Sequence, residues 1–181
     1  MTRHELRWSG YGGQGIVTMG LVFGRAAVME AQWDAVMTEA YGPEITGGWS
    51  RADLVMSSDT VEYPLVTRPE ALVVMSQDGL ARFTDEVRDD GLILGEIDLV
   101  KCDDPRYHPV RALSLAEELG KRVVANSIMI GALAAALPIL PLEYVRTELL
   151  AGVPPKTVEL NEKAFEEGVA QGEAIRAKLE A

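Results

Sequence analysis

The sequence predicts an α/β fold, in the form of a three-layer α/β/α sandwich around a Rossmann-like, mostly parallel or mixed sheet. A strand-like segment, Leu6 to Trp8, passes through a glycine-rich turn into a long apolar segment, Ile16 to Glu30, that suits a buried helix. A second segment, Ala71 to Met75, is continuously apolar, which is typical of a strand covered by helices on both faces. Residues 1–181 have the length of one domain, and no linker or internal repeat divides them.

The other strands follow from alternating or short apolar runs between turn residues. We expect them at Asp34 to Tyr41, Ala52 to Ser57, Leu92 to Ile97 and Val123 to Ala125. A further strand at Tyr107 to Val110 belongs at an edge of the sheet, because Pro109 cannot donate to a ladder.

The other helices are placed by capping residues and by apolar periodicity. A short helix should begin at Asp78, and a capping box of Ser114 and Glu117 should open another that Gly120 closes. We expect Asn126 to cap an apolar, fully buried helix that Pro138 ends. The last two helices are expected at Leu142 to Leu150 and from Leu160 onward, the latter with Phe165, Val169, Gly172, Ile175 and Leu179 on one stripe.

Composition excludes several classes of function. The 28 acidic and 17 basic residues give a net charge of −11, which repels nucleic acid. One cysteine, Cys102, excludes an internal disulfide and a four-cysteine iron–sulfur cluster, and two histidines argue against a zinc site, so no metal is expected. The longest apolar run, Ile128 to Ile139, is too short to cross a membrane, and the charged first residues do not resemble a signal peptide. We therefore expect a cytoplasmic protein with no membrane contact.

The turn between the first strand and its helix is the strongest candidate site. Gly10, Gly12, Gly13 and Gly15 free the backbone to approach a ligand closely, and unpaired amides at a helix start attract anions such as phosphate. Gln14 adds a side-chain amide. The alternative is a tight turn without a ligand.

The spacing of Gly10, Gly12 and Gly15 matches the dinucleotide pattern G-x-G-x-x-G. That interpretation lacks its ribose-binding acid, since Asp34 falls at the start of the second strand and Glu39 comes late. A P-loop is excluded, because no lysine or hydroxyl follows Gln14 at the required place.

A second loop adds further candidate residues, namely Glu44, Thr46, Gly47 and Gly48. If the two glycine turns end neighbouring strands, they form a crevice at the sheet edge where α/β proteins commonly bind ligands. The alternative is that the glycines only shape a long surface loop. No nucleophile with a neighbouring base is visible, so no catalytic residue is assigned.

Four motifs in order resemble the gamma subunit of the 2-oxoacid:ferredoxin oxidoreductases. They are Gly10-Tyr11-Gly12-Gly13-Gln14-Gly15, Tyr41-Gly42-Pro43-Glu44 with Gly47-Gly48, Asn126 to Gly131, and Asn161 with Ala164-Phe165 and Gly168. The resemblance covers nearly the whole chain. It implies the fold of domain III of pyruvate:ferredoxin oxidoreductases, a Rossmann-like α/β/α domain with a mixed sheet.

The resemblance also implies a division of labour. Alpha and beta subunits hold thiamine diphosphate, a ferredoxin-like delta subunit and partner chains hold iron–sulfur clusters, and the complex converts a 2-oxoacid and coenzyme A to acyl-CoA, carbon dioxide and reduced ferredoxin. The gamma subunit is associated with coenzyme A binding, through the two glycine loops and Asn126, and with packing against the thiamine-binding subunits. Where the family usually has an arginine before the paired glycines, this chain has Thr46.

The sequence therefore leaves three functions open. The first is a non-catalytic subunit that helps bind coenzyme A, the second is an assembly module whose glycine turn docks on a partner, and the third is a free-standing dinucleotide oxidoreductase. Pyruvate, 2-oxoglutarate and branched 2-oxoacids all remain open as substrates, with 2-oxoglutarate or a branched acid preferred. The isolated chain is expected to be inactive and to form homodimers through the surface its partners would cover.

Overall fold

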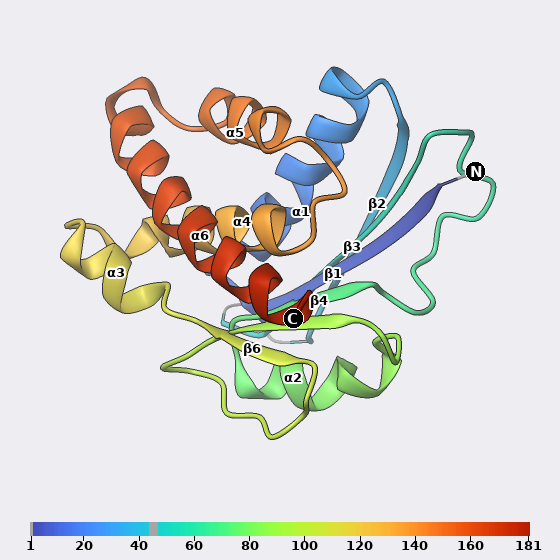
Figure 1. The fold of residues 1–181 in the computed structure, drawn as a ribbon, viewed down its shortest axis with the longest axis horizontal. Helices are drawn as coiled ribbons and strands as arrows, with labels where there is room; N and C mark the ends of the chain where they lie inside the picture. The colour runs from blue at the N-terminus through green and yellow to red at the C-terminus, as the bar shows by residue number, and fades with distance from the viewer. Residues whose placement is uncertain (1, 44–46) are drawn as a thin grey trace.

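A mixed sheet runs through the middle of the molecule, with helices above and below it (Figure 1). The computed structural model describes residues 2–43 and 47–181, and within them the sheet has six strands in the order β2-β3-β1-β4-β5-β6. The strands are β1 (Arg3–Tyr11), β2 (Asp34–Tyr41), β3 (Trp49–Ser57), β4 (Ala71–Val74), β5 (Leu92–Glu96) and β6 (Tyr107–Val110). Strand β3 is antiparallel to both neighbours, whereas β1, β4, β5 and β6 are parallel, so the predicted mixed sheet is confirmed.

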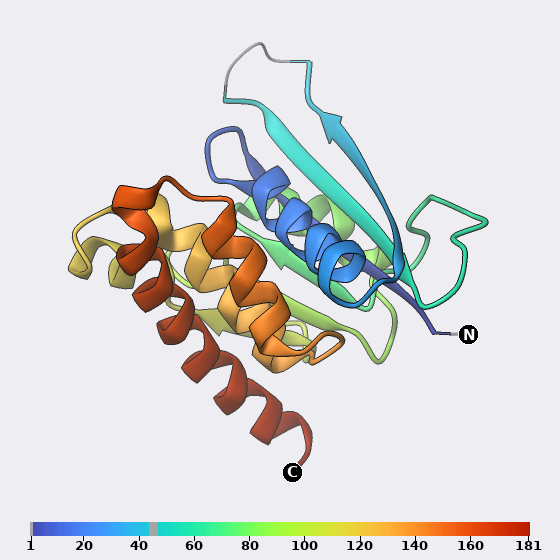
Figure 2. The ribbon, with the colours of Figure 1, turned by 90° about the horizontal axis from the view of Figure 1, so that it is seen from above.

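The helices cover the two faces unequally (Figures 1 and 2). On one face lie α1 (Ile16–Arg25), continued by the π-helical turn η1 (Ala26–Glu30), and α3 (Leu113–Glu118), η3 (Arg122–Val124), α4 (Ala125–Ala136), α5 (Leu142–Ala151), η4 (Pro155–Thr157) and α6 (Val158–Leu179). On the other lie α2 (Gln77–Phe83) and η2 (Thr84–Glu86). This is the predicted three-layer sandwich. No helix in the described ranges has the length and apolar character needed to span a membrane.

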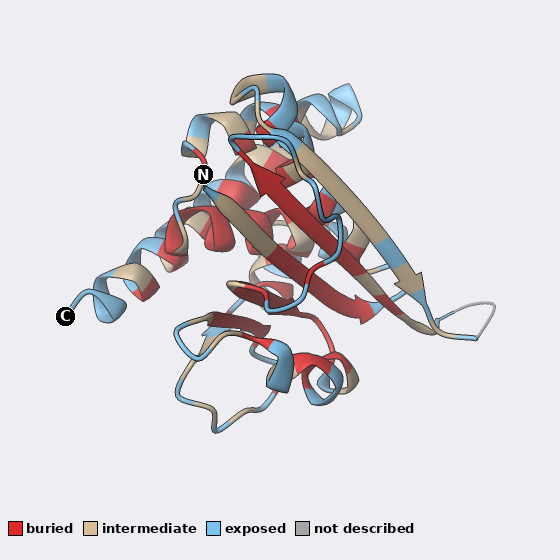
Figure 3. Ribbon diagram, turned by 90° about the vertical axis from the view of Figure 1, so that its right-hand side faces the viewer, coloured by how far each residue is buried: buried red, intermediate tan, exposed pale blue. Residues whose placement is uncertain are grey.

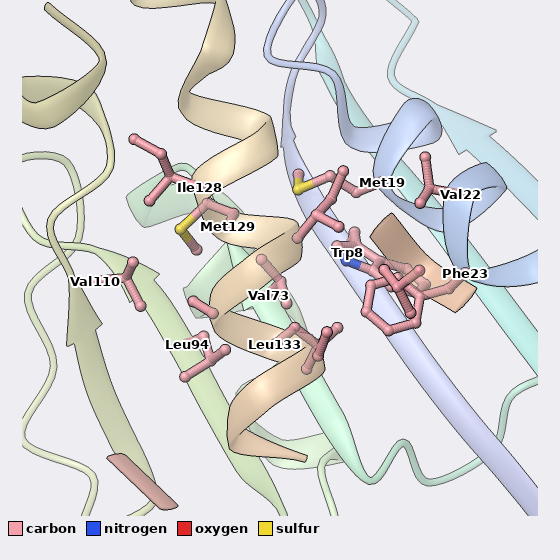
Figure 4. Packing of buried hydrophobic residues seen from close by; sticks show 14 of the residues in the cluster. Trp8, Met19, Val22, Phe23, Val73, Leu94, Val110, Ile128, Met129 and Leu133 are labelled. Atoms are coloured by element: carbon pink, nitrogen blue, oxygen red, sulfur yellow. The ribbon is translucent and has the colours of Figure 1, made fainter. Parts of the chain in front are cut away.

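Helix α4 fills the centre of the core above the sheet (Figure 4). Its side chains contribute to one apolar cluster with those of β4 and β5, where Leu133 and Met129 face Val73 and Leu94. Residues on all sides of α4 are buried, as the uniformly apolar sequence predicted. Burial of this kind supplies most of the stabilisation of a domain, at about 25 cal/mol for each Å² of apolar surface removed from water.

Helices α4 and α6 approach each other through glycines. A Cβ placed on Gly131 would meet the Phe165 carbonyl oxygen, and one placed on Gly168 would meet the carbonyl oxygen of Ile128 and come within 2.9 Å of the Ala132 amide. The two backbones are therefore in direct contact, with no side chain between them. Leu179, which the predicted stripe placed on the buried side of α6, is 54 % exposed because the helix extends past the core.

The face of the sheet under α2 carries a buried ion pair. Arg7 of β1 donates to both carboxylate oxygens of Asp53 on β3, at 2.6 and 3.1 Å, and also pairs with Glu86. The guanidinium lies 5.0 Å from the centre of the Phe83 ring. Its charge is thus compensated in a place where an unpaired one would be costly.

Three local predictions were wrong. Val123 to Ala125 is not a strand: the chain turns through η3 directly into α4, so the sheet ends at β6. For the same reason α4 begins before Asn126, and Val124 occupies the cap position. The capping box at Ser114 does not form, because α3 begins at Leu113, whose amide donates instead to the buried carboxylate of Glu96 at 3.0 Å.

Candidate functional site

The glycine turn lies at the carboxyl end of β1, where it leads into α1. Gly10 belongs to the strand itself, where a Cβ would come within 2.8 Å of the Ile16 side chain. Gly13 and Gly15 adopt positive φ angles of 91° and 77°, which residues with a side chain rarely accept. Gly15 is the cap residue of α1, so the predicted passage from strand through turn to helix is confirmed.

The second glycine turn touches the first. The Gly12 amide donates to the Gly48 carbonyl at 3.0 Å, and Gly47 has a φ of 73°. The prediction that the turns end neighbouring strands needs correction: Gly47 and Gly48 lead into β3, and β3 separates β1 from β2. The turns meet because β3 runs antiparallel to β1, so its beginning lies beside the end of β1. The candidates Glu44 and Thr46 lie outside the described residues.

Gln14 holds the first turn closed from within. Its Oε1 accepts from the Tyr11 amide at 2.6 Å, and its Nε2 donates to the Met75 carbonyl at 2.9 Å, which ties the turn to the end of β4. One hydrogen of Nε2 remains for another acceptor. The expectation that Gln14 donates to a ligand therefore rests on that hydrogen alone.

Asn126, predicted as a site residue, lies directly beside the turn. A Cβ on Gly15 would come within 2.6 Å of Asn126 Nδ2. The Asn126 Oδ1 accepts from the Ser127 amide at 2.8 Å, and the Ser127 hydroxyl donates to Asn161 on α6 at 2.7 Å. Asn161, whose role the sequence did not indicate, therefore supports the position of Asn126 from the neighbouring helix.

Two adjoining hollows open around the turn. The larger, of about 410 Å³, is lined by Gly12, Gly13, Gly15 and Asn126, and the smaller, of about 280 Å³, shares Gly13 and Asn126. The larger alone falls within the roughly 300–1,000 Å³ typical of small-molecule sites. Within the described part of the chain, the amides of Gly13 and Gly15 and the Asn126 Nδ2 have no hydrogen-bond partner, so they are donors available to a ligand.

Several lining residues were not found from the sequence. Arg122 and Val123 line the smaller hollow, and Tyr11 and Tyr41 the larger. Arg122 is the sole charged side chain that lines either hollow among the described residues, and it makes only an exposed ion pair with Glu117 at 3.4 Å. Val123 was missed because the apolar segment Val123 to Ala125 was taken for a buried strand, whereas the side chain of Val123 is 71 % exposed.

The lining of the hollows suits binding rather than catalysis. The hydrogen bond to Glu39 raises the pKa of Tyr41, so the phenol stays protonated at neutral pH. No carboxylate, histidine or cysteine of the described residues lines either hollow. What the hollows offer is backbone and amide donors with one guanidinium, a combination that suits an anionic ligand.

The position of the hollows is the one at which open α/β sheets commonly bind ligands. From β1 the chain leads to β2 and β3 on one side, and from β4 it leads to β5 and β6 on the other. The crevice at such a switch point, outside the carboxyl ends of the strands, is formed here by the glycine turn and Met75. Fold and site together define an α/β protein that has two adjoining hollows at the switch point of its sheet.

Comparison with known proteins narrows this class to one family. Residues 5–171 match the family model described as pyruvate ferredoxin/flavodoxin oxidoreductase. The chain is 37 % identical to the 2-oxoglutarate synthase subunit KorC of Methanocaldococcus jannaschii, over 92 % of each chain. The chain therefore belongs to the 2-oxoacid:ferredoxin oxidoreductase family, as a gamma subunit.

Solved structures agree with this assignment. The gamma subunit of a keto/oxoacid ferredoxin oxidoreductase from Geobacter sulfurreducens has a TM-score of 0.87 and 30 % identity, with 97 % of this chain and 99 % of that one covered. The 2-oxoglutarate:ferredoxin oxidoreductase of Magnetococcus marinus, solved with 2-oxoglutarate, coenzyme A and succinyl-CoA bound, has the same fold, with a TM-score of 0.85 and 18 % identity. There the match covers 96 % of this chain and 32 % of the longer one.

Proposed function

We propose that this gamma subunit helps to bind coenzyme A at the two hollows, within a complex that oxidises 2-oxoglutarate. The observation that carries the proposal is the contact between the two glycine turns, Gly12 to Gly48, beside the available amides of Gly13 and Gly15. Coenzyme A carries phosphates, and backbone amides at a helix start, together with a guanidinium such as Arg122, suit such groups. The coenzyme A bound in the Magnetococcus enzyme supports the choice of ligand, and the name of the KorC relative supports the oxoacid.

The chemistry is assigned to companion chains. Alpha and beta subunits would hold thiamine diphosphate, and a delta subunit and partner chains the iron–sulfur clusters that pass electrons to ferredoxin. This chain would hold coenzyme A, which accepts the acyl group, and in isolation the chain would be inactive. The uncharged, unreactive lining of the hollows, apart from Arg122, is consistent with that role.

A calorimetric titration tests the proposal. Coenzyme A is titrated into the assembled complex carrying Gly13→Ala, where no atom of the described residues lies within 4 Å of the added Cβ, so the change acts on the turn and the hollows rather than on the core. We expect coenzyme A affinity to fall at least tenfold. Gly152→Ala, at a helix end with ordinary surroundings, is the matched control. Unchanged affinity for coenzyme A in a correctly assembled Gly13→Ala complex would show that this turn does not bind coenzyme A.

An assembly role for the same turn has one observation in its favour. Tyr11, Tyr41 and Val123 at the rim are 43 %, 60 % and 71 % exposed, and exposed apolar side chains around a hollow also suit a protein partner. Under this second proposal Gly13→Ala abolishes co-purification with the companion subunits before it affects any ligand. The two outcomes of one variant therefore separate the two roles.

A dinucleotide fits the site less well than coenzyme A. In dinucleotide-binding folds the acid that holds the ribose follows the strand next to the glycine turn. Here β3 lies between β1 and β2, and the two acids of β2 are engaged elsewhere: Glu39 with Tyr41, and Asp34 with the Val61 amide at 3.3 Å. We expect no thermal shift of the chain with NAD or NADP at millimolar concentration.

A further inference from the structure

The two hollows are compartments of one site, because they share part of their lining. The residues that line both are Gly13, Gln14, Val123 and Asn126. Two of them supply donors that no described residue uses, namely the Gly13 amide and the Asn126 Nδ2. A ligand that extends from one hollow into the other would therefore pass these donors in its middle.

Arg122 lies at one end of this combined site. It lines the smaller hollow and not the larger, and it is the one charged side chain of the described residues on either. The turn η3 places it directly before α4, whose first residues, Ala125 and Asn126, line the same hollow. The start of this 12-residue helix adds its own positive potential to that of the guanidinium. The smaller hollow is therefore the end of the site that favours a strongly charged anion.

The guanidinium of Arg122 is only weakly engaged within the described part of the chain. It pairs with Glu117 at 3.4 Å, and the two side chains are 65 % and 58 % exposed. Exposed ion pairs of this kind contribute little to stability, so a phosphate can displace the Glu117 carboxylate at small cost. A guanidinium offers phosphate two parallel donors, which gives both affinity and orientation.

Coenzyme A has anionic groups in two separate places. A diphosphate lies in the middle of the molecule, between the pantetheine arm and the adenosine, and a further phosphate is attached to the ribose at the adenosine end. The latter is a monoester and carries close to two charges at neutral pH. The smaller hollow, of about 280 Å³, is below the roughly 300–1,000 Å³ of a whole small-molecule site, so it suits one end of such a ligand.

We infer that Arg122 binds the ribose phosphate of coenzyme A and thereby selects coenzyme A over its dephosphorylated form. The inference rests on the proposed function, because it assigns one part of that ligand to one part of the proposed site. The diphosphate then lies at the donors shared by the two hollows. The pantetheine arm, which ends in the thiol, extends past the glycine turn into the larger hollow, beside Tyr11 and Tyr41. Arg122 is thus a specificity-determining residue that also sets the direction of the ligand.

A comparison of coenzyme A with dephospho-coenzyme A, which lacks only the ribose phosphate, tests this assignment. Both are titrated calorimetrically into the assembled complex with an unaltered gamma chain, with Arg122→Gln and with Arg122→Lys. We expect the unaltered complex to prefer coenzyme A at least about tenfold. Arg122→Gln should abolish that preference by weakening coenzyme A alone. Arg122→Lys should keep part of it, because lysine retains the charge but not the planar pair of donors.

Three results would overturn the inference. They are the absence of a preference in the unaltered complex, an unchanged preference in Arg122→Gln, and an equal weakening of both ligands in that variant. The last result would place the diphosphate, which both ligands carry, at Arg122.

Arg68→Gln is the matched control. Arg68 is 58 % exposed and pairs with Asp89 at 3.1 Å, so its replacement removes the same charge from a similar surface pair. It lies in the mostly exposed segment between β3 and β4 and lines neither hollow (Figure 3). Both affinities should stay unchanged in this variant. A loss of preference equal to that of Arg122→Gln would trace the effect to the overall charge of the chain and overturn the inference.

Gly13→Ala separates this inference from the proposed function. If Gly13→Ala weakens both ligands while Arg122→Gln affects them equally, the inference fails and the proposed function stands. If neither variant changes the affinity for coenzyme A in a correctly assembled complex, both fail together.

Discussion

The side-chain amide of Asn126 occupies the space that a Cβ of residue 15 would need, with Nδ2 only 2.6 Å from that position. Gly15 is also held at a φ of 77°. The start of α1 and the side chain of Asn126, which was predicted as a site residue, therefore pack directly against each other. A larger side chain at either position would displace the other.

Gly15→Ala should therefore destabilise the protein by more than Gly13→Ala. Both place a side chain at positive φ, which costs roughly 1–2 kcal/mol, but only residue 15 adds a clash with Asn126. We expect a loss of about 3 kcal/mol in the free energy of unfolding for Gly15→Ala, measured by urea denaturation. Equal losses for the two variants would show that Asn126 moves aside freely.

Gly168→Ala should separate α4 from α6. The added Cβ meets the carbonyl oxygen of Ile128, a backbone atom that cannot rotate away. Overpacking of this kind costs about 1–3 kcal/mol, and we expect the upper end of that range. Gly152→Ala, with its nearest atoms at 3.4 and 3.5 Å, is the control and should change stability by less than about 0.5 kcal/mol. A thermal unfolding series compares the two directly.

Arg7→Met should be strongly destabilising, because it leaves the Asp53 carboxylate buried with a poorer partner. Asp53 is 4 % exposed, and after the substitution Arg51, at 3.1 Å, is the one cation of the described residues that still pairs with it. Removal of one member of a buried pair costs about 3–5 kcal/mol, and Arg51 should keep the loss near the lower end of that range. Restoration of much of that stability by the double variant Arg7→Met/Asp53→Leu would identify the stranded carboxylate as the cause; no restoration would point to lost packing on Phe83.

The stability of the protein should fall as pH drops below about 6.5. Burial, and to a lesser degree the charge of Lys178, lowers the pKa of His108 from its ordinary value of 6.5. Below pH 6.5 the unfolded state therefore binds a proton that folded His108 does not, and stability decreases until the folded pKa is reached. Between about pH 5 and 7.5, the free energy of unfolding measured by urea denaturation should change less steeply with pH in His108→Gln than in the original protein. An unchanged pH dependence would contradict the assignment of this effect to His108.

Much of the fold could be predicted because the local signals and the packing agree. The central parallel strands β4 and β5 contain apolar runs, and Gly20 allows α1 to approach the sheet, where a Cβ would come within 3.3 Å of Ala52. The sequence cannot reveal that β3 inserts between β1 and β2, since strand order is a long-range property. The triplet at Val123 was misread for a related reason: Val124 and Ala125 are buried in the core, but Val123 is exposed and lines an open hollow.

The candidate site was predicted where it depends on backbone conformation and missed where it depends on the meeting of distant segments. Positive φ at Gly13 and Gly15 is permitted by the residue type, which is why the sequence marks this turn. Arg122 is an ordinary surface arginine by its neighbours in sequence, and only the turn of η3 brings it to the hollow. The supporting role of Asn161 also depends on distant segments, because its side chain bonds to Ser127, 34 residues earlier in the chain.

The bond between Asn161 and Ser127 limits how far this protein can be shortened. Every described residue that lines the two hollows precedes position 127, so a fragment ending at Ala151 would contain that lining in full. It would lack α6, and with it the glycine-to-backbone contact and the hydroxyl–amide bond that hold the start of α4 in place. The smallest fragment that keeps the proposed site in place therefore includes α6, although among the described residues that helix contributes none to the lining of either hollow.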